Sequence, residues 1–235
     1  MSNSSARIIA ALVLITASSP ALAQDVRYSW FEMSYVGGQD IDRDGSFTEI
    51  VLGQTVDVSA LDGDGIKFRG SVGTWKNLFA FMDYGSSDID VSALVSNAQG
   101  QFPAEDEFDF TTVRAGVGIK WSLTPKTDIF GALSFDSTDF DFGSFAGEDF
   151  DTDDQDVGFT LGIRSIFRDK IELRAHARQT GVGDVDLSSG KLDSDTLFGL
   201  GFGFELIRGL SITGDYESGE FSNWNIGFRL DLDED

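Results

Sequence analysis

One acidic segment of the sequence has the spacing of a calcium-binding loop. Asp40, Asp42 and Asp44 stand at alternate positions, and Gly45 follows them. Carboxylates at this spacing converge on one calcium ion, and the glycine permits the sharp turn between them. The twelfth position of such a loop is a bidentate glutamate, whereas here it is Val51. We therefore weigh calcium binding at the three aspartates against a solvated acidic loop, and the mismatch favours the loop.

The histidine and cysteine content restricts the remaining chemistry. The chain has one histidine, His176, and no cysteine, so neither disulfides nor thiolate metal sites can form. His176 alternates with Arg174 and Arg178 along one short segment, and Glu172 has the same parity. We interpret this group as a set of ion pairs rather than a catalytic site. We expect that the protein is not an enzyme and that it needs no cofactor other than the calcium considered above.

The overall charge is strongly negative. Asp and Glu number 40 against 17 Lys and Arg, which gives a formal net charge of −23. Such a chain repels nucleic acid, so we exclude that class of partner. With 21 phenylalanines the sequence is too aromatic for a disordered chain. The composition therefore indicates an acidic, folded protein.

Strict alternation of apolar and polar residues predicts β-strands. It is clearest at residues 112–121, 170–179 and 224–232, where one side is apolar and the other is charged or glycine. Each segment has about ten residues, the length at which a tilted strand crosses a bilayer. Less regular segments that we also predict as strands are residues 28–38, 65–73, 78–88, 127–136, 156–166, 195–206 and 210–217. The total is ten strands, with eight strands and a long first hairpin as the alternative.

The predicted connections alternate between short and long. The short ones, which carry Lys and Arg, are residues 74–77, 122–126, 167–169 and 207–209. The long ones, which hold most of the acidic residues, are residues 39–64, 89–111, 137–155 and 180–194. This order predicts an all-β, up-and-down antiparallel transmembrane β-barrel whose two ends face different compartments. We expect the short turns in the periplasm and the acidic loops outside the cell.

In such a barrel the apolar face contacts lipid and the polar face lines the lumen. Alternation then predicts a lumen ion network of Glu32, Arg69, Arg114, Arg164, Glu172, Arg174, His176, Arg178, Glu205 and Arg229. Lys67, Asp83, Lys120, Asp215, Glu217 and Asp231 share that face. The whole set is nearly neutral in an acidic chain, as expected for buried charges that must be paired. The alternative is the wet face of a soluble sheet, which has no reason to depart from the overall charge.

The N-terminus predicts export. A basic residue, Arg7, precedes an apolar run at residues 8–17, and Ala21 and Ala23 form a small-x-small cleavage site. This pattern is typical of a secretory signal peptide. We expect residues 1–23 to be the signal peptide and residues 24–235 to form one barrel domain.

Short phrases along the predicted strands resemble the small outer-membrane β-barrel family of Gram-negative bacteria, with its OmpA-like and porin-like members. They are residues 70–72, 127–131, 162–164, 171–173 and 227–229. The resemblance implies a location in the outer membrane, contact with its lipid and lipopolysaccharide, and insertion by the barrel-assembly machinery. A structural or passive envelope role is the expectation. The alternatives are a narrow porin-like channel for ions or small solutes, and loop-mediated surface binding or adhesion, with or without the help of calcium.

Overall fold

The computed structural model describes residues 28–41, 47–51, 54–75, 77–97, 100–145, 148–186, 191–219 and 221–232. These residues form strands joined by turns. The strands are β1 (Trp30–Ile41), β2 (Phe47–Val51), β3 (Gln54–Trp75), β4 (Leu78–Asn97), β5 (Gly100–Thr124), β6 (Thr127–Phe145), β7 (Glu148–Phe167), β8 (Ile171–Asp186), β9 (Lys191–Ile207), β10 (Leu210–Ser218) and β11 (Phe221–Asp231). No helix in this part of the chain is long and apolar enough to cross a membrane.

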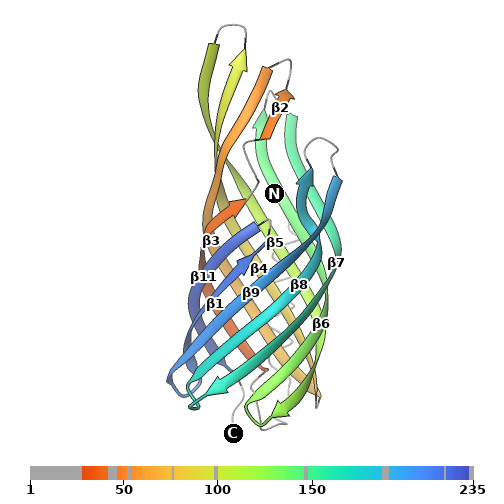
Figure 1. Ribbon diagram of the computed structural model, residues 1–235, viewed down its shortest axis with the longest axis vertical. Helices are drawn as coiled ribbons and strands as arrows, with labels where there is room; N and C mark the ends of the chain where they lie inside the picture. Colours follow the sequence, from red (N-terminus) through yellow and green to blue (C-terminus); the bar gives the residue numbers. More distant parts are fainter. Residues whose placement is uncertain are drawn as a thin grey trace.

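The sheet closes on itself (Figure 1). From β3 to β11 each strand pairs with the next in antiparallel order, and β1 pairs with both β11 and β3. The short strand β2 pairs only with β3, beyond the segment where β3 contacts β1. The wall therefore has ten strands, β1 and β3 to β11, in up-and-down order. The prediction of a ten-stranded antiparallel barrel is confirmed, and the eight-stranded alternative is wrong.

Several strands are much longer than predicted. β3, β4 and β5 have 22, 20 and 25 residues, and they continue through segments that we expected to be loops, such as residues 89–97 and 100–111. In Figure 1 these hairpins rise well above the closed barrel. An extension in water needs no apolar face, so the period-two pattern disappears while backbone hydrogen bonding continues. The predicted loop boundaries at this end of the barrel were therefore wrong. The prediction that the long connections lie together at one end was not wrong.

Tight turns close the other end. Between β7 and β8, Arg168 and Asp169 both have positive φ, 50° and 60°. Positive φ at both central residues defines the type I′ turn, whose twist matches that of paired strands. Between β9 and β10, Gly209 has a φ of 82°, which a glycine adopts without steric cost. These turns fix the register of the strands that carry the lumen charges.

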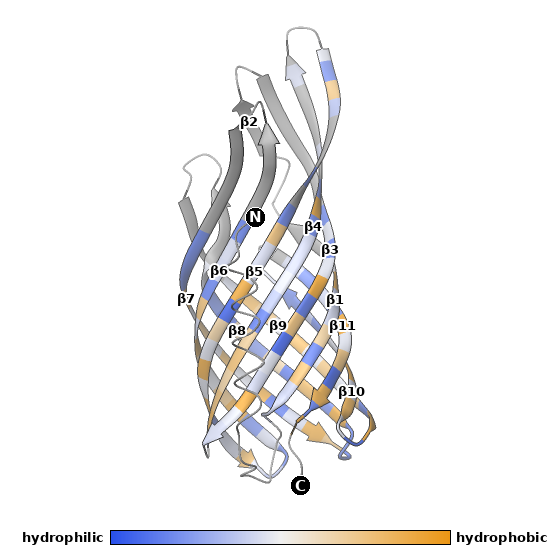
Figure 2. Ribbon diagram, turned by 180° about the vertical axis from the view of Figure 1, so that it is seen from behind, coloured by the Kyte–Doolittle hydropathy of each residue, from blue (hydrophilic) through white to orange (hydrophobic). Residues whose placement is uncertain are grey.

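The two faces of the wall have opposite polarity. Glu32, Asp83, Glu172 and Arg229 are buried inside the barrel, whereas many large apolar side chains are exposed on its outside. Figure 2 shows the resulting alternation of hydrophilic and hydrophobic residues along the strands. The interior of this fold is therefore an ionic lumen, and the functional site must be sought there and on the apolar exterior.

Candidate functional site: the ionic lumen and the apolar exterior

Strand register places charges of alternating sign next to one another on the inner wall. Glu32 on β1 lies directly opposite Arg229 on β11 and Arg69 on β3. The same row continues over the next three strands with Asp83, Arg114 and Asp136. Opposite charges at directly paired positions stabilise a sheet, so this row of six favours the observed register. The charges of neighbouring strands thus compensate one another and keep the lumen nearly neutral.

Arg69 links this row to a distant part of the wall. Its guanidinium donates to Glu32, with Nε 2.9 Å from Oε1, and its Nη2 also contacts Asp215 on β10. Strands β1 and β11 lie between β3 and β10 in the sheet. Arg69 therefore connects strands that share no backbone hydrogen bonds, and it does so through the lumen. On the same row, Nη2 of Arg114 donates to the carboxylate of Asp83.

Glu172 on β8 is the most highly paired carboxylate of the lumen. Arg229 on β11 donates to it through both terminal nitrogens, Nη1 at 2.9 Å and Nη2 at 2.8 Å. Arg164 on β7 donates from 2.5 Å, and Nε of Arg174 lies 3.5 Å away. Only 4% of Glu172 is exposed. One buried carboxylate thus balances guanidinium groups from three strands.

Two ion pairs form across β9, between side chains of β8 and β10. At both places the inner face of β9 has a glycine. Arg174 on β8 and Asp215 on β10 flank Gly201, and their Nη2 and Oδ1 atoms are 3.0 Å apart. A Cβ atom on Gly201 would lie 3.0 Å from Nε of Arg174 and closer still to Asp215. The glycine therefore allows the two charged side chains to meet directly across β9.

A second pair repeats this arrangement one step higher. His176 and Glu217 flank Gly199, and Nε2 of His176 lies 2.9 Å from Oε1 of Glu217. Arg178 lies 3.6 Å from Glu217 and 3.8 Å from Asp136, so it joins this pair to the charged row. The histidine is consequently one member of a chain of ion pairs.

An aromatic group occupies the lumen near the short turns. Tyr28 and Phe79 have ring centroids 4.9 Å apart, and Phe79 lies 6.2 Å from Phe81 and 6.4 Å from Phe130. The ammonium group of Lys120 lies 4.4 Å from the centroid of the Tyr28 ring. We call these four rings the aromatic floor. They lie near the short turns, beside Arg164, whose guanidinium carbon is 5.4 Å from the centroid of the Tyr28 ring.

The predicted residues do not all fall in one place. Nine of the ten residues in the predicted lumen network take part in the ion pairs described above: Glu32, Arg69, Arg114, Arg164, Glu172, Arg174, His176, Arg178 and Arg229. Glu205 lies beside the β9–β10 turn instead, where its carboxylate accepts a hydrogen bond from the backbone N–H of Gly209.

The candidate calcium loop falls outside the described residues. Asp42 and Asp44 are not described, and for Asp40 the description covers only its backbone in β1. Among the described side chains, no group of three or more His, Asp or Glu residues is arranged to hold a metal ion. Calcium binding at these aspartates stays a prediction.

Sequence reasoning missed two parts of the lumen. Two aspartates of β6 were omitted from the inner face: Asp128, which is completely buried, and Asp136, which accepts a hydrogen bond from Thr180 at 2.8 Å. Their parity within residues 127–136 was the available signal, but Phe130 and Ala132 share that face and hide the alternation. The aromatic floor was missed for the same reason, because large apolar side chains were expected only on the outside.

The exterior carries a continuous apolar surface. Trp75 is 72% exposed and Leu200 is 65% exposed. Aromatic residues exposed on the outside include Tyr35, Trp121, Phe135, Tyr216 and Trp224. An apolar exterior around an ionic interior is the reverse of a soluble barrel and the arrangement that lipid requires. The chain has the architecture of a transmembrane β-barrel.

Comparisons with known proteins give only distant similarities. No protein-family model and no curated protein matches the chain. Among solved structures, the translocator domain of autotransporter NalP from Neisseria meningitidis is 13% identical with a TM-score of 0.49, covering 97% of this chain and 95% of that one. OprG from Pseudomonas aeruginosa is 12% identical with a TM-score of 0.41, covering 89% and 98%. Ail of Yersinia pestis, in complex with a heparin analogue, is 10% identical with a TM-score of 0.40, covering 86% and 99%.

A charge placed on the exterior of this transmembrane barrel should be costly in proportion to its depth. We expect Leu200→Arg, in the middle of the apolar surface of β9, to lower the free energy of unfolding in lipid by about 2–4 kcal/mol. Thr196→Arg, on the same face of β9 but near the apolar edge, should cost much less. Urea titration in phospholipid vesicles, followed by tryptophan fluorescence, measures both. Equal costs would contradict a lipid-facing β9.

Proposed function

We propose that the protein is an integral outer-membrane barrel with a structural, passive envelope role and a lumen closed by its own side chains. The observation that carries the proposal is the pairing of charges across the lumen, from Arg69 to Asp215 and from Glu172 to Arg229. Each of these pairs joins strands separated by two others in the sheet. The side chains therefore reach over the interior and do not simply coat the wall. No catalytic step is part of this proposal.

The same contacts disfavour an ion channel. A ten-stranded barrel encloses little more than the space its own side chains fill. Here Arg164, Arg174 and Arg229 converge on Glu172, and the aromatic floor lies beside them, with Tyr28 against Arg164. An ion that passed would have to separate buried pairs, each of which is costly to break. A closed barrel is the simpler consequence.

Planar-bilayer recording tests the closed lumen directly. The refolded mature protein should produce no steady conductance steps, whereas a general porin inserted into the same bilayers should produce them. Double substitution of the floor, Phe79→Ala with Phe130→Ala, leaves the ion pairs in place and should also remain silent. Steady openings of the unsubstituted protein would refute the closed lumen and favour the narrow-channel alternative.

The proposed location places the short turns in the periplasm and the long hairpins outside the cell, beside lipopolysaccharide. The basic turn residues, such as Lys126 and Arg208, and the acidic hairpins, with Asp88 and Asp109 exposed, support this orientation. We further propose that residues 1–23 direct export and that the barrel-assembly machinery inserts the mature chain.

The absence of cysteine makes the orientation easy to measure. We expect Asp88→Cys, on the exposed extension of β4, to react in intact cells with a maleimide that cannot cross the membrane. Lys126→Cys, in the exposed β5–β6 turn, should react only after the outer membrane is permeabilised. Fractionation should recover both variants with the outer membrane. Labelling of Lys126→Cys in intact cells would invert the proposed orientation.

A further inference from the structure

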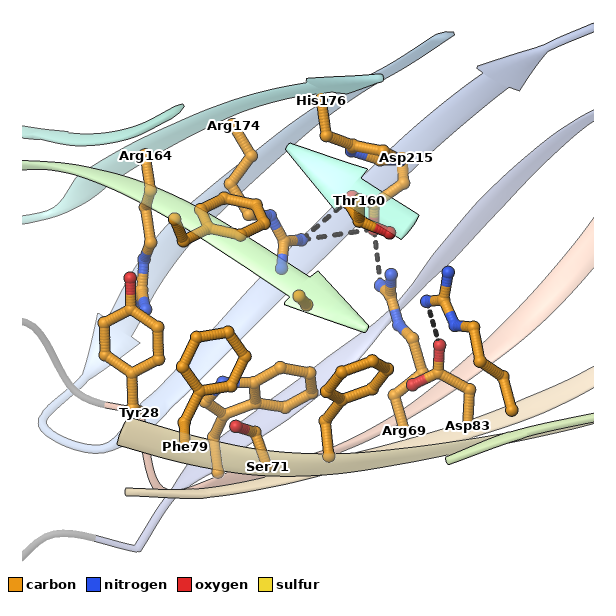
Figure 3. Close-up of a pocket in the computed structure, with 15 residues that line it drawn as sticks. Tyr28, Arg69, Ser71, Phe79, Asp83, Thr160, Arg164, Arg174, His176 and Asp215 are labelled. Atoms are coloured by element: carbon orange, nitrogen blue, oxygen red, sulfur yellow. Dashed lines mark hydrogen bonds and ion pairs between the residues drawn. The ribbon is translucent and has the colours of Figure 1, made fainter. Parts of the chain in front are cut away.

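A cavity of about 130 Å³ lies between the aromatic floor and the ion pairs of the lumen. Figure 3 shows Tyr28 and Phe79 on one side of this space and Arg174 on the other. Five aromatic side chains line it: Tyr28, Trp30, Phe79, Phe81 and Phe130. Ser71, Ala132 and Thr160 are the small side chains of the wall. The cavity is thus apolar on one side and ionic on the other.

The ionic side is predominantly basic. Four arginines line the cavity, Arg69, Arg114, Arg164 and Arg174, against two aspartates, Asp83 and Asp215. Arg174 bonds Asp215 through Nη2 at 3.0 Å. Its Nε lies 3.5 Å from Glu172 but makes no hydrogen bond. A guanidinium has five N–H donors in a planar fork, so these two carboxylates do not exhaust it. Such a fork matches the two oxygens of a second carboxylate.

A buried hydroxyl adds a polar group on the apolar side. Ser71 is 5% exposed, and its Oγ makes no hydrogen bond to any described residue. Leaving a buried hydroxyl unpaired costs free energy, which a bound polar atom would recover. Ser71 lines the same cavity as Phe79 and Arg174 (Figure 3). Binding pockets for small molecules combine these features: a mostly apolar wall with a few fixed polar groups.

We propose that this cavity binds a small carboxylate whose body is a single ring. The rings of the floor contact the body, and the arginine side, Arg174 foremost, holds the carboxylate. Cavities of about 150 Å³ hold benzene, so a monocyclic body is the size limit for this one. This site goes beyond the proposed function, because a closed barrel needs no ligand and a ligand at this place needs no pore.

Calorimetry with benzoate as the probe tests the site on the refolded mature chain in detergent micelles. We expect saturable binding with a dissociation constant of about 1 mM or lower, after subtraction of the heat in empty micelles. Benzyl alcohol has the same ring without the charge and should bind about tenfold more weakly. Equal affinities would overturn the role of the arginines, and absence of saturable benzoate binding would overturn the site.

A matched pair of substitutions locates the site. Ala132→Leu fills the cavity and should weaken benzoate binding by about tenfold or more. Ala115→Leu makes the same change on the exposed side of β5 and should leave the affinity unchanged. Ser71→Ala removes one hydroxyl of the cavity wall and should also weaken benzoate binding. This variant replaces Ala132→Leu in the test if Ala132→Leu does not give the heat-modifiable folded band on a gel. If the variants that alter the cavity bound benzoate as tightly as Ala115→Leu, the site would be overturned. The closed lumen is tested separately, by bilayer conductance.

Discussion

Glu172→Gln should be among the most destabilising single substitutions in this barrel. The carboxylate lies between Arg164, Arg174 and Arg229 and is almost completely buried. Glutamine keeps the shape but removes the negative charge, so the three guanidinium groups lose the counterion that they share. Arg174 and Arg229 then keep their contacts with Asp215 and Asp231, which carry one charge each. Breaking a buried ion pair from one side costs about 3–5 kcal/mol, because the remaining charge stays in a poor solvent. We expect a loss of this size in the free energy of unfolding.

Unfolding in urea, with the protein in phospholipid vesicles, measures the effect of Glu172→Gln. The matched control is Asp169→Asn. It breaks the ion pair between Asp169, in the β7–β8 turn, and Lys126, in the β5–β6 turn. Both side chains of that pair are largely exposed, so water and salt screen them and the stability should hardly change. A loss for Glu172→Gln no larger than for Asp169→Asn would mean that the lumen is well hydrated and the network is weak.

Gly201→Ala should disrupt the lumen network without adding or removing any charge. The new Cβ atom would contact Asp215 and lie 3.0 Å from Nε of Arg174, so the ion pair must separate or the wall must move. Inserting a methyl group into a well-packed interior costs about 1–3 kcal/mol, and the weakened ion pair adds to this. We expect a lower unfolding midpoint in urea and a lower temperature at which the folded band disappears from a gel.

The control for Gly201→Ala lies two residues away on the same face of β9. A Cβ atom on Gly203 would meet the Cβ of Glu172 at 3.4 Å, which is ordinary contact. Gly203→Ala changes the same strand propensity but separates no ion pair, so its effect should be small. If both variants lost the same stability, the cost would come from the strand and not from the pair across β9.

The sequence by itself determined the polarity of the wall. In a strand successive side chains point to opposite faces, so the parity of Arg164, Glu172 and Arg229 already placed them opposite the apolar residues. The ten wall strands, their order and the end with short turns also followed from the local pattern. The pattern failed above the membrane, where β3, β4 and β5 continue with both faces in water and no longer alternate.

Only the tertiary structure decided which charges meet. Arg69 and Asp215 are 146 positions apart in the sequence and come together because the sheet closes between β1 and β11. The glycines of β9 were visible in the sequence as small residues. That Gly201 lies between Arg174 and Asp215 depends on the register of β9 with both β8 and β10. Parity assigns a face, whereas partners depend on closure and register, which no single strand contains.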